Sequence, residues 1–355
     1  MLLAQTIEKI GELAARPMQE ARERLDSLIK PPQSLGRLEE LAVQLAGITG
    51  SPRPQIKSKV VILMAGDHGV VEEGVSAAPQ EITWQMLGHF VQGVAGIGVL
   101  ARHVDARLVV VDAGVAAEAN VPGVLNRKVR PGTGNITRGP AMTQEEAIKA
   151  LEIGIEVARQ EVARGADLLA LGDMGIGNTT PSSAILAVLS KRRPEEVTGR
   201  GTLVSDEVLV RKARAIERAI AINQPDPGDA LDVLAKVGGL EIAGLAGVVL
   251  GAAAERKPVL LDGFITTAAA MIAYGLAPRA INFMVASHLS AEQGHRLMLE
   301  YLGLAPVLYL DMRLGEGTGA ALAMPVLEAA CRVINEMLSF QEAGVSELEA
   351  GKLLR

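Results

Sequence analysis

Aromatic side chains are scarce in this sequence. Only 2% of its 355 residues are aromatic, whereas 49% are hydrophobic and 38 are glycine. The core must therefore consist mainly of Ala, Val, Leu, Ile and Met side chains, with many glycines between them. This composition favours close packing of helices on a sheet.

Cysteine is almost absent. With a single cysteine, Cys331, the chain cannot form an internal disulfide. Cys331 lies in the apolar run of residues 329–334, and no partner base marks it as a catalytic thiol. We interpret it as a residue that packs inside a helix.

Blocks of positive charge and long apolar runs are missing as well. The formal net charge is −6, and without a basic block the chain lacks the usual footprint of a nucleic-acid-binding protein. No apolar stretch of about 18 residues is free of charged and turn residues, although residues 238–254 are long, apolar and glycine-rich. Residues 1–28 alternate charged and apolar positions, unlike a signal peptide. We expect a small-molecule partner, no nucleic acid, no membrane and a cytoplasmic location.

Six short aliphatic runs each stop at a small or acidic residue, and helical patterns or glycine-rich turns lie between most of them. Runs that do not alternate with polar residues suit strands that are buried on both faces of a parallel sheet. The runs are residues 60–64, 108–111, 168–171, 259–261, 281–285 and 307–310. They predict an α/β, Rossmann-like fold with a mostly parallel six-stranded sheet flanked by helices.

The two ends of the chain have a different pattern. Residues 6–49 and 325–355 are helical in pattern and lie outside the strand series, and Pro52 and Pro54 mark a boundary after the first segment. We expect residues 1–54 and 325–355 to form a small helical domain. Residues 55–324 would then form a large α/β catalytic domain.

Polar residues follow the predicted strands at their carboxyl ends, where open parallel sheets bind ligands. They are Asp67, Asp112, Asp173, Asp262, His288 and, just beyond the last strand, Glu316. Ordinary turn chemistry explains each Asp-Gly pair singly. It explains their recurrence on one edge less well, so the pattern indicates a site at this edge.

The glycine-rich segment of residues 172–183 follows a predicted strand and opens a predicted helix, with Thr180 as a possible N-cap and Pro181 at the first helical position. Such a turn presents backbone N–H groups and the positive end of a helix, which favour a phosphate. It matches neither the Walker A loop nor the dinucleotide fingerprint. Its spacing alone suits phosphate binding and a tight packing turn equally well.

Two further residues have both an ordinary and a functional interpretation. Glu316 stands between Gly315 and Gly317, which permit a planar ligand to approach closely, but a loop glutamate is usually solvated. Lys212 lies in a basic cluster on a helical stretch, where surface ion pairing and phosphate neutralisation are both possible. The five histidines show no tight metal-ligand spacing, so we predict no catalytic metal and no cofactor.

Six motifs together resemble a known family. They are residues 30–39, 67–69, 175–181, 219–225, 261–264 and 313–317. In this order, from about residue 28 to residue 335, they are similar to the nicotinate-nucleotide:dimethylbenzimidazole phosphoribosyltransferase family. Six ordered motifs are a far stronger signal than any one of them.

The resemblance implies transfer of the 5-phosphoribosyl group from nicotinate mononucleotide to 5,6-dimethylbenzimidazole, which yields α-ribazole 5′-phosphate and nicotinate for the lower ligand of cobalamin. The leaving pyridinium nitrogen departs as a neutral amine and needs no acid. The attacking benzimidazole becomes cationic and must lose a proton, for which one carboxylate base suffices. By resemblance that base is Glu316. A β-configured substrate and an α product imply one inverting displacement at an oxocarbenium-like carbon.

The resemblance also implies the substrate-binding residues and a homodimer. Phosphate and ribose contacts carry over to Gly175, Ile176, Gly177, Asn178, Lys212, Gly263 and Ser290, although Ser290 could equally be a helix N-cap. Ala78 and Met86 stand at base-pocket positions where the family has polar Ser and Gln, and Pro79 and Leu314 complete the substrate-binding set. Gln85 would compensate for Met86 only with a shifted helix register. Asp173 stands where the family has a glutamate, which leaves its role open.

Two other functions are compatible with parts of the sequence. A transferase that uses phosphoribosyl pyrophosphate would need an adjacent acidic pair at a strand end followed by a Thr-Gly-type phosphate loop, and none is found. A Rossmann-like nucleotide-binding protein without catalysis would suit the sheet alone, but would leave Glu316 unused.

Overall fold

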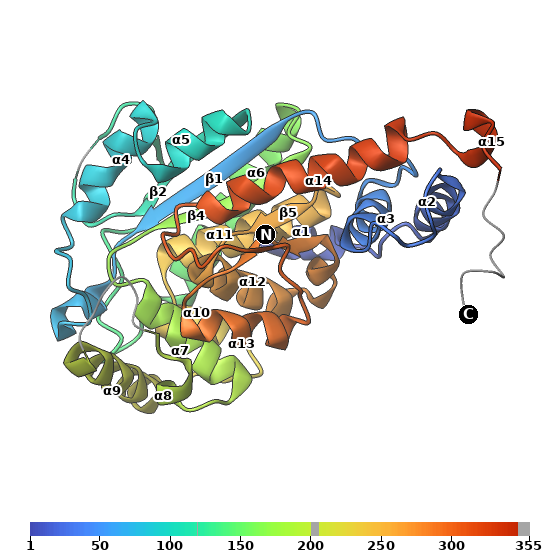
Figure 1. Ribbon diagram of the computed structural model, residues 1–355. Coiled ribbons are helices and arrows are strands. Elements are labelled where there is room, and N and C mark those ends of the chain that lie inside the picture. Colours follow the sequence, from blue (N-terminus) through green and yellow to red (C-terminus); the bar gives the residue numbers. More distant parts are fainter. Residues whose placement is uncertain (119, 200–205, 347–355) are drawn as a thin grey trace. The chain divides into compact units, whose positions relative to one another are not determined.

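The computed structural model describes residues 1–118, 120–199 and 206–346 (Figure 1). The chain divides into two compact units, one of Met1–Gly11 and Ser58–Ala323 and one of Glu12–Lys57 and Met324–Arg355. The expected domain division assigned the first eleven residues to the helical domain, and it assigned residues 55–57 and 324, which group with the second unit, to the α/β domain. The first eleven residues group with the sheet, and the Leu3 N–H donates to Glu152 Oε1 at 3.0 Å. Residues 347–355 of the expected helical domain lie outside the described residues.

The secondary structure consists of helices and short parallel strands. The strands are β1 (Lys59–Gly66), β2 (Ala106–Gly114), β3 (Leu125–Asn126), β4 (Leu168–Met174), β5 (Val259–Leu261), β6 (Met284–Ala286), β7 (His288–Leu289) and β8 (Leu308–Tyr309). The α-helices are α1 (Leu2–Lys9), α2 (Ala15–Ser27), α3 (Arg37–Thr49), α4 (Ile82–Gln92), α5 (Gly96–His103), α6 (Gln144–Ala163), α7 (Thr179–Ser190), α8 (Pro194–Val197), α9 (Asp206–Asn223), α10 (Ala230–Val237), α11 (Leu240–Ala254), α12 (Phe264–Leu276), α13 (Gln293–Leu302), α14 (Thr318–Glu336) and α15 (Phe340–Ala343). Two 3₁₀ helices, η1 (Gly69–Glu73) and η2 (Pro278–Phe283), complete the described elements.

The main sheet has six strands in the order β3-β2-β1-β4-β5-β6, and all of its neighbouring strands pair in parallel. Strand β1 is central, and all eight of its residues are buried. A strand that is covered on both faces needs apolar side chains at every position, which explains its run of aliphatic residues. The predicted fold class is confirmed.

Two strand predictions were wrong in detail. The run at residues 307–310 forms β8, which pairs with β7 in a separate two-stranded sheet, and the sixth strand of the main sheet is instead the two-residue β3. The run at residues 281–285 begins as part of η2, so β6 starts later, at Met284. Short apolar runs reveal burial, but strand pairing depends on where the chain returns.

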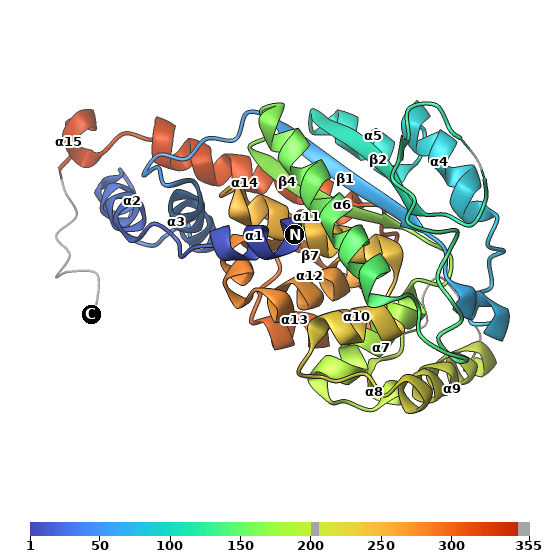
Figure 2. The same cartoon turned by 180° about the vertical axis from the view of Figure 1, so that it is seen from behind.

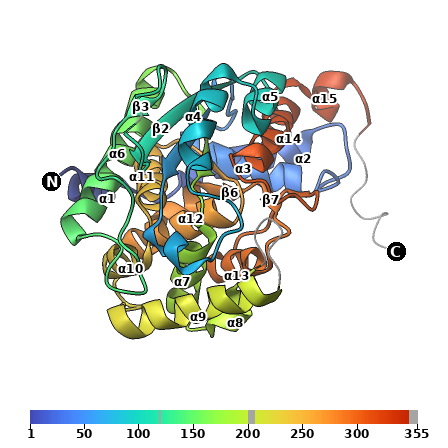
Figure 3. The same cartoon turned by 90° about the vertical axis from the view of Figure 1, so that its left-hand side faces the viewer.

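Helices cover both faces of this sheet. Helices α6 and α11 lie behind β1 in Figure 1, and α6 lies in front of the sheet in the reversed view of Figure 2. Helix α4 packs on β1 and β2, and helix α5 packs on β2. Helices α7, α8, α9 and α10 gather in one region of the unit in all three views, including Figure 3.

Helices α6 and α11 approach each other through glycines. A Cβ atom on Gly154 would overlap the carbonyl oxygen of Gly244, and a Cβ on Gly247 would overlap that of Leu151. Helix α11 is buried from Leu240 to Ala253, so it needs an apolar surface all round. The scarcity of aromatic residues and the abundance of glycine thus correspond to close packing, as expected.

The second unit joins segments from both ends of the chain. Leu28 and Ser339 form an isolated antiparallel bridge, and Arg24 pairs with Glu342 at 2.9 Å. Within the N-terminal segment, Lys30 Nζ lies 2.8 Å from Glu39 Oε1 in a buried ion pair. Cys331 is buried in α14, as its apolar surroundings predicted.

Candidate active site

A cavity of about 270 Å³ opens at the carboxyl ends of the strands in the first unit. Its lining comes from the segment before α4 and the first part of α4, the turn between β4 and α7, helix α9, the start of α12, the segment from β7 to α13, and the loop before α14. The lining residues are Val75, Ser76, Ala77, Ala78, Ile82, Met86, Asp173, Met174, Gly175, Ile176, Gly177, Asn178, Thr179, Lys212, Gly263, Phe264, Ile265, His288, Ser290, Glu292, Arg313, Leu314, Gly315 and Glu316.

The turn between β4 and α7 forms one wall of the cavity. A Cβ on Gly175 would overlap the carbonyl oxygen of Gly66, and Gly177 has a φ of +90°, so both positions require glycine. The Ile176 N–H donates to Thr83 Oγ1 at 3.1 Å. Helix α7 begins earlier than predicted, because its N-cap is Asn178 rather than Thr180.

Lys212 is a buried cation beside this turn. Its side chain comes from α9, and Nζ donates to Thr179 Oγ1 at 2.7 Å in the first turn of α7. Burial lowers the pKa of Lys212 to about 8, against the opposing effect of the Glu292 charge. A buried ammonium group at a helix N-terminus is suited to bind an anion. The interpretation of Lys212 as a surface residue is therefore wrong.

Glu316 is buried with only 7% of its surface exposed, contrary to the interpretation of a solvated loop residue. Its φ is +63°, and those of Gly315 and Gly317 are +80° and +94°. The Ile97 N–H, in the first turn of α5, donates to Glu316 Oε2 at 3.1 Å. This contact orients the carboxylate, which also lines the cavity.

Three carboxyl groups lie near one another at this end of the sheet. Burial raises the pKa of Asp173 to about 8, and the nearby Asp262 charge adds to the effect. Burial also raises the pKa of Glu316, and the Ile97 N–H opposes that shift. The Asn178 side-chain amide donates to Asp173 Oδ2 at 3.0 Å. At neutral pH Asp173 is therefore mainly protonated and able to donate a hydrogen bond.

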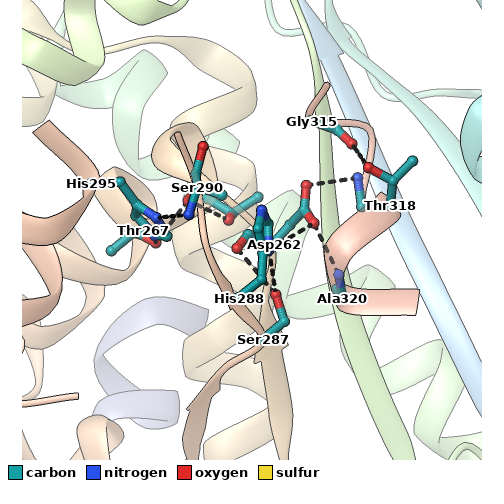
Figure 4. A network of polar contacts seen from close by, with 12 residues as sticks. Asp262, Thr267, Ser287, His288, Ser290, His295, Gly315, Thr318 and Ala320 are labelled. Atoms are coloured by element: carbon teal, nitrogen blue, oxygen red, sulfur yellow. Dashed lines mark hydrogen bonds and ion pairs between the residues drawn. The ribbon is translucent and has the colours of Figure 1, made fainter. Parts of the chain in front are cut away.

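A network of polar contacts includes the lining residues His288 and Ser290 (Figure 4). The Ser290 N–H donates to His295 Nδ1 at 2.9 Å, and Thr267 Oγ1 lies 3.0 Å from His295 Nε2. Burial lowers the pKa of His295 to about 3, so its ring is neutral and can accept. Ser290 is not the helix N-cap considered above, because α13 begins after Glu292.

Apolar residues make up another part of the lining. They include Ala78 and Met86 together with Val75, Ile82 and Met174. Gln85 is exposed and does not line the cavity, so no register shift brings it inward to replace Met86. The pocket therefore offers a hydrophobic surface where the family resemblance led us to expect a base pocket.

All but one of the predicted site residues line the same cavity. The exception is Pro79, which is exposed next to Ala78. Among the strand-end carboxylates, Asp67 and Asp112 do not line the cavity. They accept backbone N–H groups from Ala116 and Val115, each at 2.8 Å, and so hold loops. The binding and catalytic roles of the lining residues stay predictions.

Sequence reasoning missed several contributors to this site. Ile97 contributes a backbone N–H, which no side-chain pattern could reveal. Thr179 and Glu292 also line the cavity without having been singled out, whereas the strand-end positions of His288 and Asp262 were noticed but not assigned a role. A polar residue directly after a buried strand is thus the sequence feature by which His288 and Asp262 could have been found.

Two kinds of feature are absent from the described residues. No group of three or more His, Cys, Asp or Glu side chains in this part of the chain could hold a metal ion. None of the described helices is long and apolar enough to cross a membrane.

The cavity lies in a chain that is similar to known phosphoribosyltransferases. Residues 10–345 match the family model described as Phosphoribosyltransferase. The nicotinate-nucleotide–dimethylbenzimidazole phosphoribosyltransferase of Chloroflexus aggregans is 55% identical over 347 residues, which are 98% of each chain. That of Desulforamulus reducens is 55% identical over 348 residues, 98% of this chain and 99% of the relative.

A solved structure has the same fold. The crystal structure of CobT from Thermus thermophilus has a TM-score of 0.91 and 50% sequence identity, and the match covers 94% of this chain and 100% of that chain. The chain therefore belongs to the nicotinate-nucleotide–dimethylbenzimidazole phosphoribosyltransferase family.

Proposed function

We propose that this chain transfers the 5-phosphoribosyl group from nicotinate mononucleotide to 5,6-dimethylbenzimidazole, giving α-ribazole 5′-phosphate and nicotinate for cobalamin. The names of relatives at 55% identity support the two substrates. The observation that carries the mechanism is Glu316, a buried carboxylate in the cavity wall with one oxygen fixed by a backbone N–H. The proposal includes cytoplasmic location and the homodimer expected from the sequence.

The phosphate end of the substrate is assigned to the turn between β4 and α7. Lys212 supplies positive charge at the start of α7, beside Asn178 and the two glycines of the turn. Gly263 and Ser290 line the same cavity and are assigned to the phosphate and ribose. Anion binding would raise the pKa of Lys212 again, because an opposite charge favours the ammonium form.

The acceptor base is assigned to the apolar lining around Met86 and Ala78. As one ring nitrogen attacks C1′ the benzimidazole becomes cationic, and the other nitrogen then releases its proton to Glu316. The bond from C1′ to the pyridinium nitrogen breaks, and that nitrogen leaves as a neutral amine. Attack from the face opposite the leaving group converts the β configuration into the α configuration.

Glu316 and Asp173 have different roles in this scheme. Burial raises the pKa of Asp173 to about 8, which favours its protonated form at neutral pH, so we assign the base to Glu316 and not to Asp173. Glu316 is oriented by the Ile97 N–H and serves as the proton acceptor. A positioned general base contributes roughly 10²–10⁴-fold to the rate.

The test is to incubate the purified chain with nicotinate mononucleotide and 5,6-dimethylbenzimidazole and to follow release of nicotinate and ribazole phosphate. A second assay replaces the donor with phosphoribosyl pyrophosphate. Product from that donor would indicate the rival transferase and not the proposed enzyme. Proton NMR of the product identifies the anomer. No product, or a β product, would contradict the proposal.

Glu316→Gln tests the base directly. The substitution keeps the size of the side chain but removes its basicity, so turnover should fall roughly 10²–10⁴-fold. Binding of nicotinate mononucleotide, measured by calorimetry, should persist. Unchanged turnover would remove Glu316 from the mechanism.

A further inference from the structure

We infer that Asp262 is a positioning residue for Glu316, holding the loop of residues 315–320 so that the carboxylate faces the substrate. The inference rests on the proposed function. Asp262 does not line the cavity, so it acts through the backbone of this loop and not on the substrate.

The loop that carries Glu316 has a backbone that needs support. Gly315, Glu316 and Gly317 have three successive positive φ angles, and the φ of Glu316 is +63°. A residue with a Cβ atom rarely adopts this conformation, because the Cβ crowds the neighbouring carbonyl. Contacts from outside the loop must therefore keep Glu316 in place.

Asp262 supplies such contacts on the carboxyl-terminal side of Glu316. The Gly317 N–H donates to Oδ2 at 3.0 Å, and the Ala320 N–H donates to Oδ1 at 2.9 Å (Figure 4). Each carboxylate oxygen thus accepts a backbone N–H, and the Gly319 N–H also bonds to Asp262. Gly319 and Ala320 lie in the first turn of α14. Asp262 directly follows β5 and is 1% exposed, so it is itself fixed by the sheet.

Strand β4 holds the loop at a second point. A Cβ on Gly172 would overlap the carbonyl oxygen of Glu316, so the Glu316 backbone lies directly against this strand. Thr318 Oγ1 donates to the Gly315 carbonyl at 2.8 Å and closes the turn from within. Together with Asp262, these contacts fix the backbone of Glu316, and the side chain points toward the cavity and Ile97.

Other titratable groups also face this place. Asp173 on β4 and Glu316 itself interact electrostatically with Asp262, and His288 Nδ1 on β7 lies 3.9 Å from Asp262 Oδ1. The Ser287 hydroxyl lies 3.0 Å from the same nitrogen of His288. Removing the Asp262 charge therefore changes the electrostatic surroundings of Glu316 as well as its loop.

The central test is Asp262→Asn, compared with Asp112→Asn. The asparagine amide presents N–H groups where the loop N–H groups need an acceptor. We expect kcat to fall at least about tenfold, while KM for nicotinate mononucleotide stays within about threefold. An unchanged kcat, or a rise in KM that accounts for the whole loss of activity, would overturn the inference.

Asp112 is a matched control. It is also a buried strand-end aspartate, 2% exposed, whose Oδ1 accepts the Val115 N–H at 2.8 Å. It does not line the cavity, and its other carboxylate oxygen lies 3.4 Å from Lys128 Nζ, away from the loop of residues 315–320. A merely structural effect of losing a buried carboxylate would lower stability in both variants, but only Asp262→Asn should lower kcat.

A double variant separates positioning from general damage. If Asp262 acts through Glu316, adding Asp262→Asn to Glu316→Gln should lower turnover little further. If instead the fold-losses in turnover of the two single variants multiply in the double variant, the two residues act independently, and the inference is overturned.

Hydrogen exchange tests the same inference without any substrate. Amide protons of Gly317 and Ala320 should exchange slowly in the unaltered chain and faster in Asp262→Asn. Fast exchange in the unaltered chain, or no change in the variant, would overturn it even if the proposed reaction were correct. If Asp262→Asn does not fold, Asp262→Ser removes the carboxylate without placing an amide donor against the loop, and the same outcomes apply.

Discussion

Lys212 illustrates how burial changes the role of a single residue. The sequence shows a basic cluster on a helix, and most such lysines face solvent. Here the side chain of Lys212 points inward, and only 2% of the residue is exposed. Its ammonium group reaches the first turn of α7, where a phosphate would find both a full charge and the positive end of a helix.

Lys212→Met should therefore weaken substrate binding. A hydrogen bond to a charged group is worth about 1.5–3 kcal/mol, so KM for nicotinate mononucleotide should rise roughly tenfold to a hundredfold. Affinity of the unaltered chain should also decrease as the pH rises through about 8, the pKa of the buried ammonium group. Steady-state kinetics and calorimetry from about pH 6 to about pH 9 measure both effects.

Arg214→Gln is the control for this experiment. Arg214 is exposed on the same helix and does not line the cavity. This variant should keep the KM of the unaltered chain and its decrease in affinity near pH 8. A Lys212→Met variant with the same KM and the same pH dependence as the unaltered chain would exclude Lys212 from phosphate binding.

At the scale of the elements, the crossing of α6 and α11 depends on glycine. Helix interiors usually disfavour glycine, which loses more conformational entropy on folding than alanine does. In this pair the backbones lie so close that added Cβ atoms would overlap carbonyl oxygens of the partner helix. Close backbone contact therefore outweighs helix propensity at these positions.

Gly247→Ala should destabilise the chain for this reason. Its new Cβ would overlap the Leu151 carbonyl oxygen, and overpacking of this kind costs about 1–3 kcal/mol. Urea denaturation followed by circular dichroism measures the change in the free energy of unfolding. Gly139→Ala is the control, since a Cβ there meets nothing within 4 Å. Equal stability of the two variants would show that the helices can separate at little cost.

Buried carboxyl groups at the carboxyl ends of the strands make the stability of the whole molecule depend on pH. Asp173 has a pKa of about 8 and Asp262 one of about 7, both well above 3.8, mainly because burial disfavours their charged forms. Between pH 3.8 and these values, the folded chain binds more protons than the unfolded chain. Stability contributed by the neutral carboxyls is then present at low pH and is lost as the pH rises.

Asp173→Asn tests this linkage, since asparagine stays neutral at every pH. The melting temperature of the variant relative to the unaltered chain should rise from about pH 4 to about pH 8 and then level off. Differential scanning calorimetry across that range checks the trend. The exposed Asp26 supplies the control Asp26→Asn. A difference in melting temperature that stays constant with pH would contradict a raised pKa at Asp173.

The sequence by itself determined the fold class and half of the residues that line the cavity. Non-alternating aliphatic runs revealed strands buried on both faces, because such strands have no polar side. The polar residues after those runs located the edge at which Asp173, His288 and Glu316 line one cavity. The ordered motifs pointed to the family in which the chain belongs.

The tertiary structure alone decided how these residues are held. It placed β8 with β7 instead of in the main sheet, because pairing depends on contacts between distant segments. It buried Lys212 and Glu316, which local patterns favoured as solvated residues. It also brought the Ile97 N–H and the Asp262 carboxylate to the Glu316 loop across gaps of 219 and 55 residues. Backbone groups and remote carboxylates leave no local pattern, so only the folded chain reveals that they contact Glu316 and its loop.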